Sequence, residues 1–214
     1  MPQSPIVPSH VLEDRIGCGG VLQGAVGRSR SLRLLFVLGV LGALAAIGVS
    51  PAWASPTEPE LKAALVFNFA QFVVWPPEAR PHPGESLVVG VIGTGELAEA
   101  LAQGLRDKSL DGAPLSIQRC RDLDDLASCR VLVFDAEPSA WQGVLAQPLP
   151  RGLLTVGNGE EFTKAGGIIG MVRIDKHIRF DINLAAAEAA GLTLNPTLLE
   201  LARSVGRWAP EGRP

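Results

Sequence analysis

The sequence predicts an α/β domain, a three-layer α/β/α sandwich with a largely parallel sheet and a C-terminal antiparallel hairpin. Short runs rich in Val, Leu and Ile alternate with helix-like stretches between residues 87 and 158. That alternation is typical of parallel strands joined by crossover helices. Two further apolar runs, 167–174 and 177–183, are separated only by Asp175-Lys176, which indicates a hairpin.

Residues 1–54 have the features of an N-terminal extension and a secretory signal peptide. Three arginines within 28–33 precede an uncharged apolar stretch at 34–49, and Ala52-Trp53-Ala54 supplies a cleavage site. The sixteen residues of 34–49 span about 24 Å as a helix, short of a bilayer core of roughly 30 Å. An uncleaved anchor is the alternative. We therefore expect a single exported domain, residues 55–214, that is periplasmic and not inserted in the membrane.

The charge of this domain excludes two classes of partner. Four of the 19 basic residues and two of the 22 acidic residues precede residue 55, which leaves a net charge of −5. A mildly acidic domain has no electrostatic footprint for nucleic acid or for an anionic membrane surface.

The first helix is predicted from a capping box and a proline stop. Thr57 and Glu60 have the T-x-x-E spacing, and Pro76-Pro77 ends the pattern, so we expect a helix over about 58–75. The helix is apolar on nearly all sides, and Asn68 therefore needs buried hydrogen-bond partners, which we expect near the closing hairpin.

We further predict that this helix is an association element. Leu65, Phe69, Phe72 and Trp75 supply more apolar surface than one sheet face needs. Part of the excess is expected to be covered by a second copy of the chain, which makes the protein a homodimer.

The later elements follow from periodicity. Strands are expected at 87–93, 115–120, 130–135 and 152–158, and helices at 96–105, 121–127, 138–147 and 184–191. A last helix starts at Asn195-Pro196, with Leu198, Leu201, Ala202 and Val205 as its buried stripe.

One short motif is the candidate ligand cleft. Gly93, Thr94, Gly95 and Glu96 follow a strand and open a helix, where backbone N–H groups can hold an anion. Dinucleotide binding is one alternative, although Asp111 lies in a loop and not at a strand tip. A tight turn that needs glycine for backbone reasons is another. The interpretation that we adopt is a small-ligand cleft at the end of a parallel strand, a less specific claim than dinucleotide binding.

Catalytic, cofactor and metal motifs are missing from the sequence. It contains no G-x-S-x-G, no H-E-x-x-H and no Walker loop, and His82 and His177 are expected at the surface. We therefore expect no enzyme, no cofactor and no metal. Cys120 and Cys129 are predicted to form a disulfide after export, with two free core thiols as the alternative.

Three stretches together resemble the YfiR family of bacterial periplasmic proteins. They are LKAALVFNFAQFVVWP at 61–76; GVIGTGEL at 90–97 with LTVG at 154–157 and GGII at 166–169; and RFDINLAAAEAAGL at 179–192 with LLELA at 198–202. The resemblance implies an α/β/α domain without enzymatic activity that binds the periplasmic sensor region of a membrane diguanylate cyclase and represses it. It also implies lower cyclic-di-GMP signalling and biofilm formation, dimerisation and a redox-sensitive disulfide. A periplasmic small-ligand sensor that feeds another partner is the competing interpretation.

Overall fold

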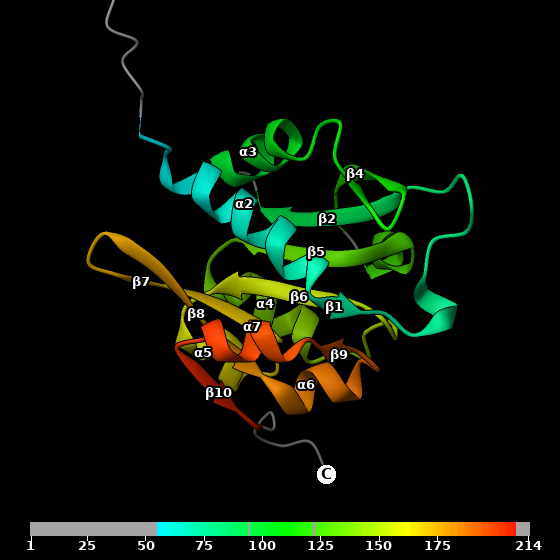
Figure 1. Ribbon diagram of the computed structural model, residues 1–214. Coiled ribbons are helices and arrows are strands. Elements are labelled where there is room, and N and C mark those ends of the chain that lie inside the picture. The colour runs from blue at the N-terminus through cyan, green and yellow to red at the C-terminus, as the bar shows by residue number, and fades with distance from the viewer. Residues whose placement is uncertain (1–54, 94, 122, 209–214) are drawn as a thin grey trace, which may run out of the picture. The chain divides into compact units, whose positions relative to one another are not determined.

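The computed structural model describes residues 55–93, 95–121 and 123–208, which fall within one compact unit. Helices cover both faces of a central sheet, so the predicted three-layer α/β/α sandwich is confirmed (Figure 1). Within the described ranges, no helix has both the length and the apolar character needed to span a bilayer.

The element bounds follow the predicted order closely. The helices are α2 (Glu58–Gln71), α3 (Glu96–Gly104), α4 (Pro138–Leu145), α5 (Glu160–Lys164), α6 (Leu184–Ala189) and α7 (Pro196–Leu201), with the 3-10 turns η1 (Pro77–Ala79) and η2 (Leu123–Ser128). The strands are β1 (Val73–Val74), β2 (Leu87–Gly93), β3 (Ser109–Leu110), β4 (Ala113–Arg119), β5 (Cys129–Asp135), β6 (Leu154–Asn158), β7 (Ile169–Ile174), β8 (His177–Asn183), β9 (Thr193–Leu194) and β10 (Ser204–Gly206).

The described residues form one eight-stranded sheet in the order β10-β8-β7-β6-β5-β2-β4-β3. β4, β2, β5, β6 and β7 run parallel, and β7 and β8 form the predicted antiparallel hairpin. The chain leaves β2 for β4 on one side and then crosses over to β5 on the other. The carboxyl ends of β2 and β5 therefore flank the point where the strand order reverses, which is where open α/β sheets commonly bind ligands.

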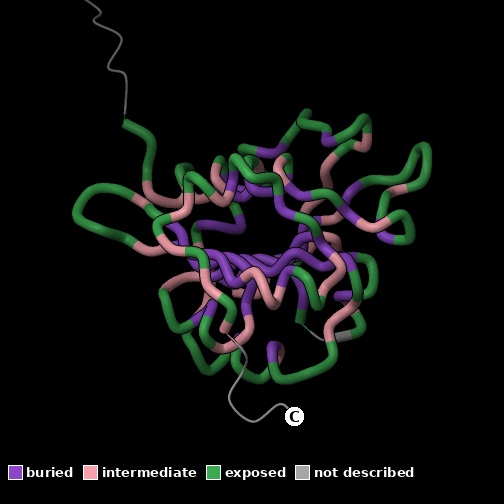
Figure 2. Tube along the Cα trace, turned by 60° about the horizontal axis from the view of Figure 1, so that its bottom comes forward, coloured by how far each residue is buried: buried purple, intermediate pink, exposed green. Residues whose placement is uncertain are grey.

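Each face of the sheet has its own apolar core. The larger core joins the sheet to α2, α3 and α7, and the smaller core joins it to η2, α4 and α5. Figure 2 shows the strands as a buried band between exposed outer segments. Because both faces are covered, the central strands are apolar on both sides, which is why they appear as continuous Val, Leu and Ile runs.

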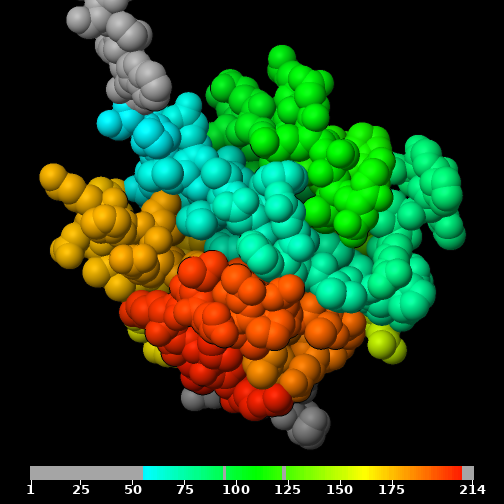
Figure 3. Space-filling model, in the orientation of Figure 1, coloured from blue at the N-terminus to red at the C-terminus, as the bar shows by residue number. Residues whose placement is uncertain are grey.

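The first helix is shorter than predicted. It ends at Gln71, and the chain then extends as β1, which pairs antiparallel with β9. The predicted capping box is present, since the Thr57 N–H donates to Glu60 Oε2 at 2.7 Å. Trp75 lies beyond the helix and donates its indole N–H to the Gly152 carbonyl at 2.9 Å. In Figure 3, the first helix and the C-terminal elements lie side by side at the surface.

The expectation that Asn68 is buried is wrong. Leu61, Ala64, Asn68 and Gln71 are all exposed and recur at helical spacing along one side of α2. Asn68 is therefore open to solvent and needs no buried partner. The buried asparagine of this fold is Asn183, at the end of β8, which no periodic pattern marks.

Asn183 connects three segments of the closing region. Its side chain donates to the Thr163 carbonyl at 2.8 Å and to the Trp208 carbonyl at 2.7 Å, and accepts from the Ala186 N–H at 3.2 Å. The last bond caps the N-terminus of α6. The residue is completely buried, so each of these bonds replaces one to water.

The last predicted helix is also too long. α7 ends at Leu201, and the chain continues as β10, parallel to β8. Leu201 and Val205 are 63% and 43% exposed, so only Leu198 of the predicted stripe is fully buried. The backbone N–H and C=O groups of β10 pair with the edge of β8. One more helical turn would satisfy the same groups within the helix but would leave that edge of β8 unpaired.

Candidate functional site

The predicted ligand cleft lies at the reversal point of the sheet. Gly95 and Glu96 line a cavity of about 420 Å³ together with Glu58, Lys62 and Asp135, which we call the switch-point cavity. Gly93 ends β2 just behind it, and Thr94 lies outside the described residues. The sequence motif therefore identifies the correct strand end, but it includes only some of the residues that line the cavity.

Two glycines let β2 and α3 come close to β5. Gly93 has a φ of +136°, and a Cβ atom on it would lie 2.1 Å from the Asp135 carbonyl oxygen. A Cβ atom on Gly95 would lie 2.1 Å from Asp135 Oδ2. Glycine at these positions thus serves close packing against the backbone and the side chain of Asp135, which explains the G-x-G pattern without a diphosphate.

Sequence reasoning missed Asp135 and Asn158. They end the neighbouring strands β5 and β6, and their atoms Asp135 Oδ2 and Asn158 Oδ1 are buried without a hydrogen-bond partner among the described residues. Such atoms are rare in native proteins and call for an explanation. The sequence did contain a signal for them, because each is the polar residue that ends an apolar strand. The carboxyl ends of parallel strands meet at one edge of the sheet, so such residues are candidates for a shared site.

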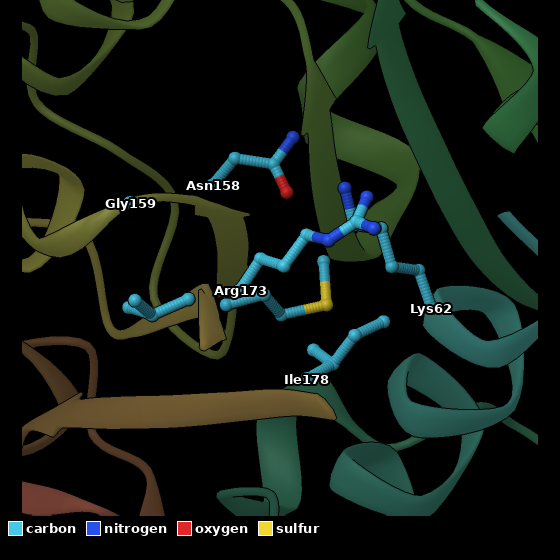
Figure 4. Close-up of a pocket in the computed structure, with 7 residues that line it drawn as sticks. Lys62, Asn158, Gly159, Arg173 and Ile178 are labelled. Carbon is cyan, nitrogen blue, oxygen red and sulfur yellow. The ribbon is translucent and has the colours of Figure 1, made fainter. Parts of the chain in front are cut away.

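A second cavity, of about 280 Å³, adjoins the first. It is lined by Lys62, Asn158, Met171 and Arg173, and Lys62 also lines the switch-point cavity. Figure 4 shows the side chains of Lys62, Asn158 and Arg173 around this space. The two cavities therefore share one wall, the first turns of α2.

An ion-pair cluster stands at that shared wall. Lys62 Nζ lies 2.9 Å from Glu58 Oε1, and Arg173 pairs with Glu58 Oε2. The hydrogen bond from Lys62 lowers the pKa of Glu58, and the charge of Arg173 adds to the effect. The cluster joins α2 to the β7–β8 hairpin, and Lys62 is thereby held by Glu58.

The dinucleotide alternative is not supported by the geometry. Asp111 has a φ of +50° and forms, with Gly112, the tight turn between β3 and β4. That turn precedes β4, which runs parallel to β2, so it lies at the amino end of the strands, opposite the switch-point cavity. Asp111 therefore cannot contact a ribose bound at Gly93.

The two cysteines lie together in the smaller core. Cys120 Sγ and Cys129 Sγ are 3.6 Å apart, and both residues are buried as free thiols. Burial raises the pKa of both thiols, that of Cys120 to about 12, and for Cys120 the neighbouring Cys129 adds to the rise. The pair is thus protonated at neutral pH and placed for a bond between the two sulfurs, which stays a prediction.

The predicted association residues are mostly used inside the domain. Phe69 and Trp75 are 1% and 6% exposed, and the Phe69 ring packs at a tilt against the Phe180 ring with centroids 4.8 Å apart. Leu65 and Phe72 are partly buried against the same core. A partner of this helix would therefore contact mainly its exposed side.

Within the described ranges, no group of three or more His, Cys, Asp or Glu side chains is placed to hold a metal ion.

These features together define an α/β domain with a crevice at the carboxyl edge of its sheet. The chain belongs to the YfiR/HmsC-like family, whose model matches residues 59–203. That family consists of periplasmic regulators of diguanylate cyclase signalling, and it is a regulatory, non-catalytic family.

Comparison with solved structures gives a similar fold in a conserved domain protein from Vibrio cholerae O1 biovar El Tor strain N16961. The two chains are 16% identical, with a TM-score of 0.46 over 70% of this chain and 60% of the other. The match thus spans less than two thirds of that protein. Nothing among curated proteins matches this chain.

Proposed function

We propose that this chain binds the periplasmic sensor region of a membrane-bound diguanylate cyclase and represses the enzyme. The observation that supports the proposal is the family match over residues 59–203, which includes almost all of the described domain. The absence of the sequence motifs of common enzyme classes agrees with action by binding.

The test is a measurement of cyclic-di-GMP in cells that carry or lack the gene. Deletion is expected to raise the nucleotide level and biofilm mass, and both should return to normal with the wild-type gene. The purified chain should also bind the isolated periplasmic region of the cyclase. Unchanged cyclic-di-GMP after deletion, with no binding to that region, would contradict the proposal.

We also propose that the chain acts as a homodimer through the exposed side of its first helix. Leu61 of that helix is 40% exposed, and Val74 of β1 and Ile174 of the β7–β8 hairpin are 51% and 39% exposed, so apolar side chains remain available for a contact between copies. Sedimentation of the wild type and of Leu61→Asp tests this. A wild-type monomer at micromolar concentration would contradict it.

A second candidate function is small-ligand sensing, which the switch-point cavity favours. Sensing and repression are compatible, because a ligand bound beside α2 could alter the same surface that contacts a partner. The genes next to this one indicate which function is the main one. An adjacent cyclase gene favours repression, and an adjacent gene for a histidine kinase or an outer-membrane receptor favours sensing.

A further inference from the structure

We propose that the switch-point cavity, together with the adjoining cavity lined by Asn158, binds a small molecule carrying a primary ammonium group, which donates hydrogen bonds to Asp135 and Asn158. The inference does not depend on repression of a cyclase, because it concerns binding by the purified chain alone.

The two acceptors lie side by side on one face of the sheet. Val133 of β5 is paired with Val156 of β6, and continuing this parallel register by two residues sets Asp135 opposite Asn158. Both valines belong to the core under α2 and α3, so side chains two residues further along point to the same face. Neighbouring strands are about 4.8 Å apart, a distance that one donor group can bridge.

Both unpartnered atoms are hydrogen-bond acceptors, so a ligand that fits them must supply donors. Asp135 Oδ2 and Asn158 Oδ1 are buried and receive no hydrogen bond from the residues that the structure describes. A carboxylate oxygen and an amide oxygen can only accept, so the complementary ligand group must be a multiple donor. An ammonium group carries three N–H donors, which suffice for both oxygens and leave one for water.

The charges around the cavity favour a cation over a neutral donor. Glu58, Glu96 and Asp135 line it with Lys62 as the one cation among the described lining residues. Lys62 is already held by Glu58 at 2.9 Å. Asp135 thus faces the cavity without a positive partner, and an anionic ligand would be repelled there.

The space suits a short aliphatic amine. The cavity has a volume of about 420 Å³, and the adjoining one, of about 280 Å³, opens beside Asn158. Gly95 has no side chain that would fill the approach to Asp135 Oδ2, since a Cβ atom there would lie 2.1 Å from that oxygen. Any other residue at 95 would therefore obstruct the oxygen that the ammonium group needs.

Calorimetric titration of the purified full-length chain tests the inference with four probes. Putrescine and L-alanine both carry a primary ammonium group, 1,4-butanediol has the shape of putrescine without charge, and succinate is an anion of similar length. We expect putrescine or L-alanine to bind and the other two probes to give no heat. Binding of putrescine alone indicates a polyamine site, and binding of L-alanine indicates a site for amino acids.

Three variants locate the binding. Asp135→Asn keeps the shape but removes the charge and should weaken binding at least tenfold, as should Asn158→Ala. Lys62→Met removes the competing cation and should tighten binding of putrescine about threefold. Glu99→Gln, an exposed carboxylate of α3 outside the cavity, is the matched control and should change affinity less than twofold. Thermal melting of each variant confirms that it is folded.

The inference is overturned if neither amine binds the wild-type chain, or if 1,4-butanediol binds as well as putrescine. Equal affinity in wild type and folded Asp135→Asn would also overturn it. If Asp135→Asn does not fold, the decision rests on Asn158→Ala and on the opposite effect expected of Lys62→Met.

Discussion

Cys120 Sγ and Cys129 Sγ lie 3.6 Å apart next to Gly90 of β2; Cys120 directly follows β4 and Cys129 begins β5, the two strands that flank β2. A disulfide needs a sulfur separation of about 2.05 Å, so a small rotation of the two side chains would bring them into bonding distance. We predict that the pair is bridged in the exported protein. Peptide mapping without reductant should recover the linked peptides, whereas two alkylatable thiols in the unfolded, unreduced protein would contradict the prediction.

The reduced protein is expected to lose stability at high pH. The ordinary pKa of 9.0 for a cysteine is raised to about 12 for Cys120, chiefly by burial. Between those two values the unfolded chain releases the proton and the folded chain keeps it, so stability is retained below pH 9 and falls from there toward pH 12. Urea unfolding of the reduced protein at several pH values measures this. The oxidised protein, which has no thiol at 120, should show a smaller loss over the same range.

Gly90 is predicted to be required because any side chain at this position would collide with the two cysteine sulfurs. A Cβ atom on it would lie 2.7 Å from each Sγ and 3.2 Å from Leu132 Cδ1. Gly90→Ala should therefore lower the free energy of unfolding by about 1–3 kcal/mol. The control is Gly143→Ala in α4, where nothing lies within 4 Å and helix propensity should raise stability by about 0.5–1 kcal/mol. Equal effects of both changes would show that the sulfurs do not occupy this space.

Asn183 and Asn68 should respond in opposite ways to replacement by alanine. Asn183→Ala removes three buried hydrogen bonds and leaves the Thr163 and Trp208 carbonyls without their donor, so about 2–3 kcal/mol of stability should be lost. Asn68→Ala alters an exposed helical position and should change stability by less than about 0.5 kcal/mol, or raise it slightly. Chemical denaturation compares the two. A large loss for Asn68→Ala would restore the buried role first expected of it.

Arg203 is predicted to be needed because it neutralises a buried carboxylate. Asp181 is 2% exposed and accepts from Arg203 Nε at 2.8 Å, with a second bond to the other carboxylate oxygen. Arg203→Met should therefore cost about 1.5–3 kcal/mol. Arg207→Met breaks the pair with Glu188, in which both side chains are more than half exposed, and should have a much smaller effect. Similar losses in the two variants would contradict this account.

Local sequence patterns were sufficient for most elements of the central sheet. The apolar runs of β2, β5 and β6, the Asp175-Lys176 turn and the Thr57–Glu60 capping box each appear where predicted. These features depend on residues close in sequence, whose spacing sets periodicity, caps and turns. The family was also recognised from the sequence, because its motifs are contiguous.

Tertiary contacts decided where some elements end and which polar side chains are buried, features that no local sequence pattern indicates. The first helix gives way to β1 at residue 73 because β9 pairs with it from 120 residues further along, and β10 replaces a last helical turn because β8 offers a free edge. Asn68 and Asn183 differ in burial for the same reason, since helix periodicity does not say which side another segment covers. Asp135 and Asn158 lie at the same edge of the sheet only because parallel strands bring their carboxyl ends together. The sequence by itself therefore determined the fold class, the order of the elements and the family, and the folded chain decided which polar side chains meet.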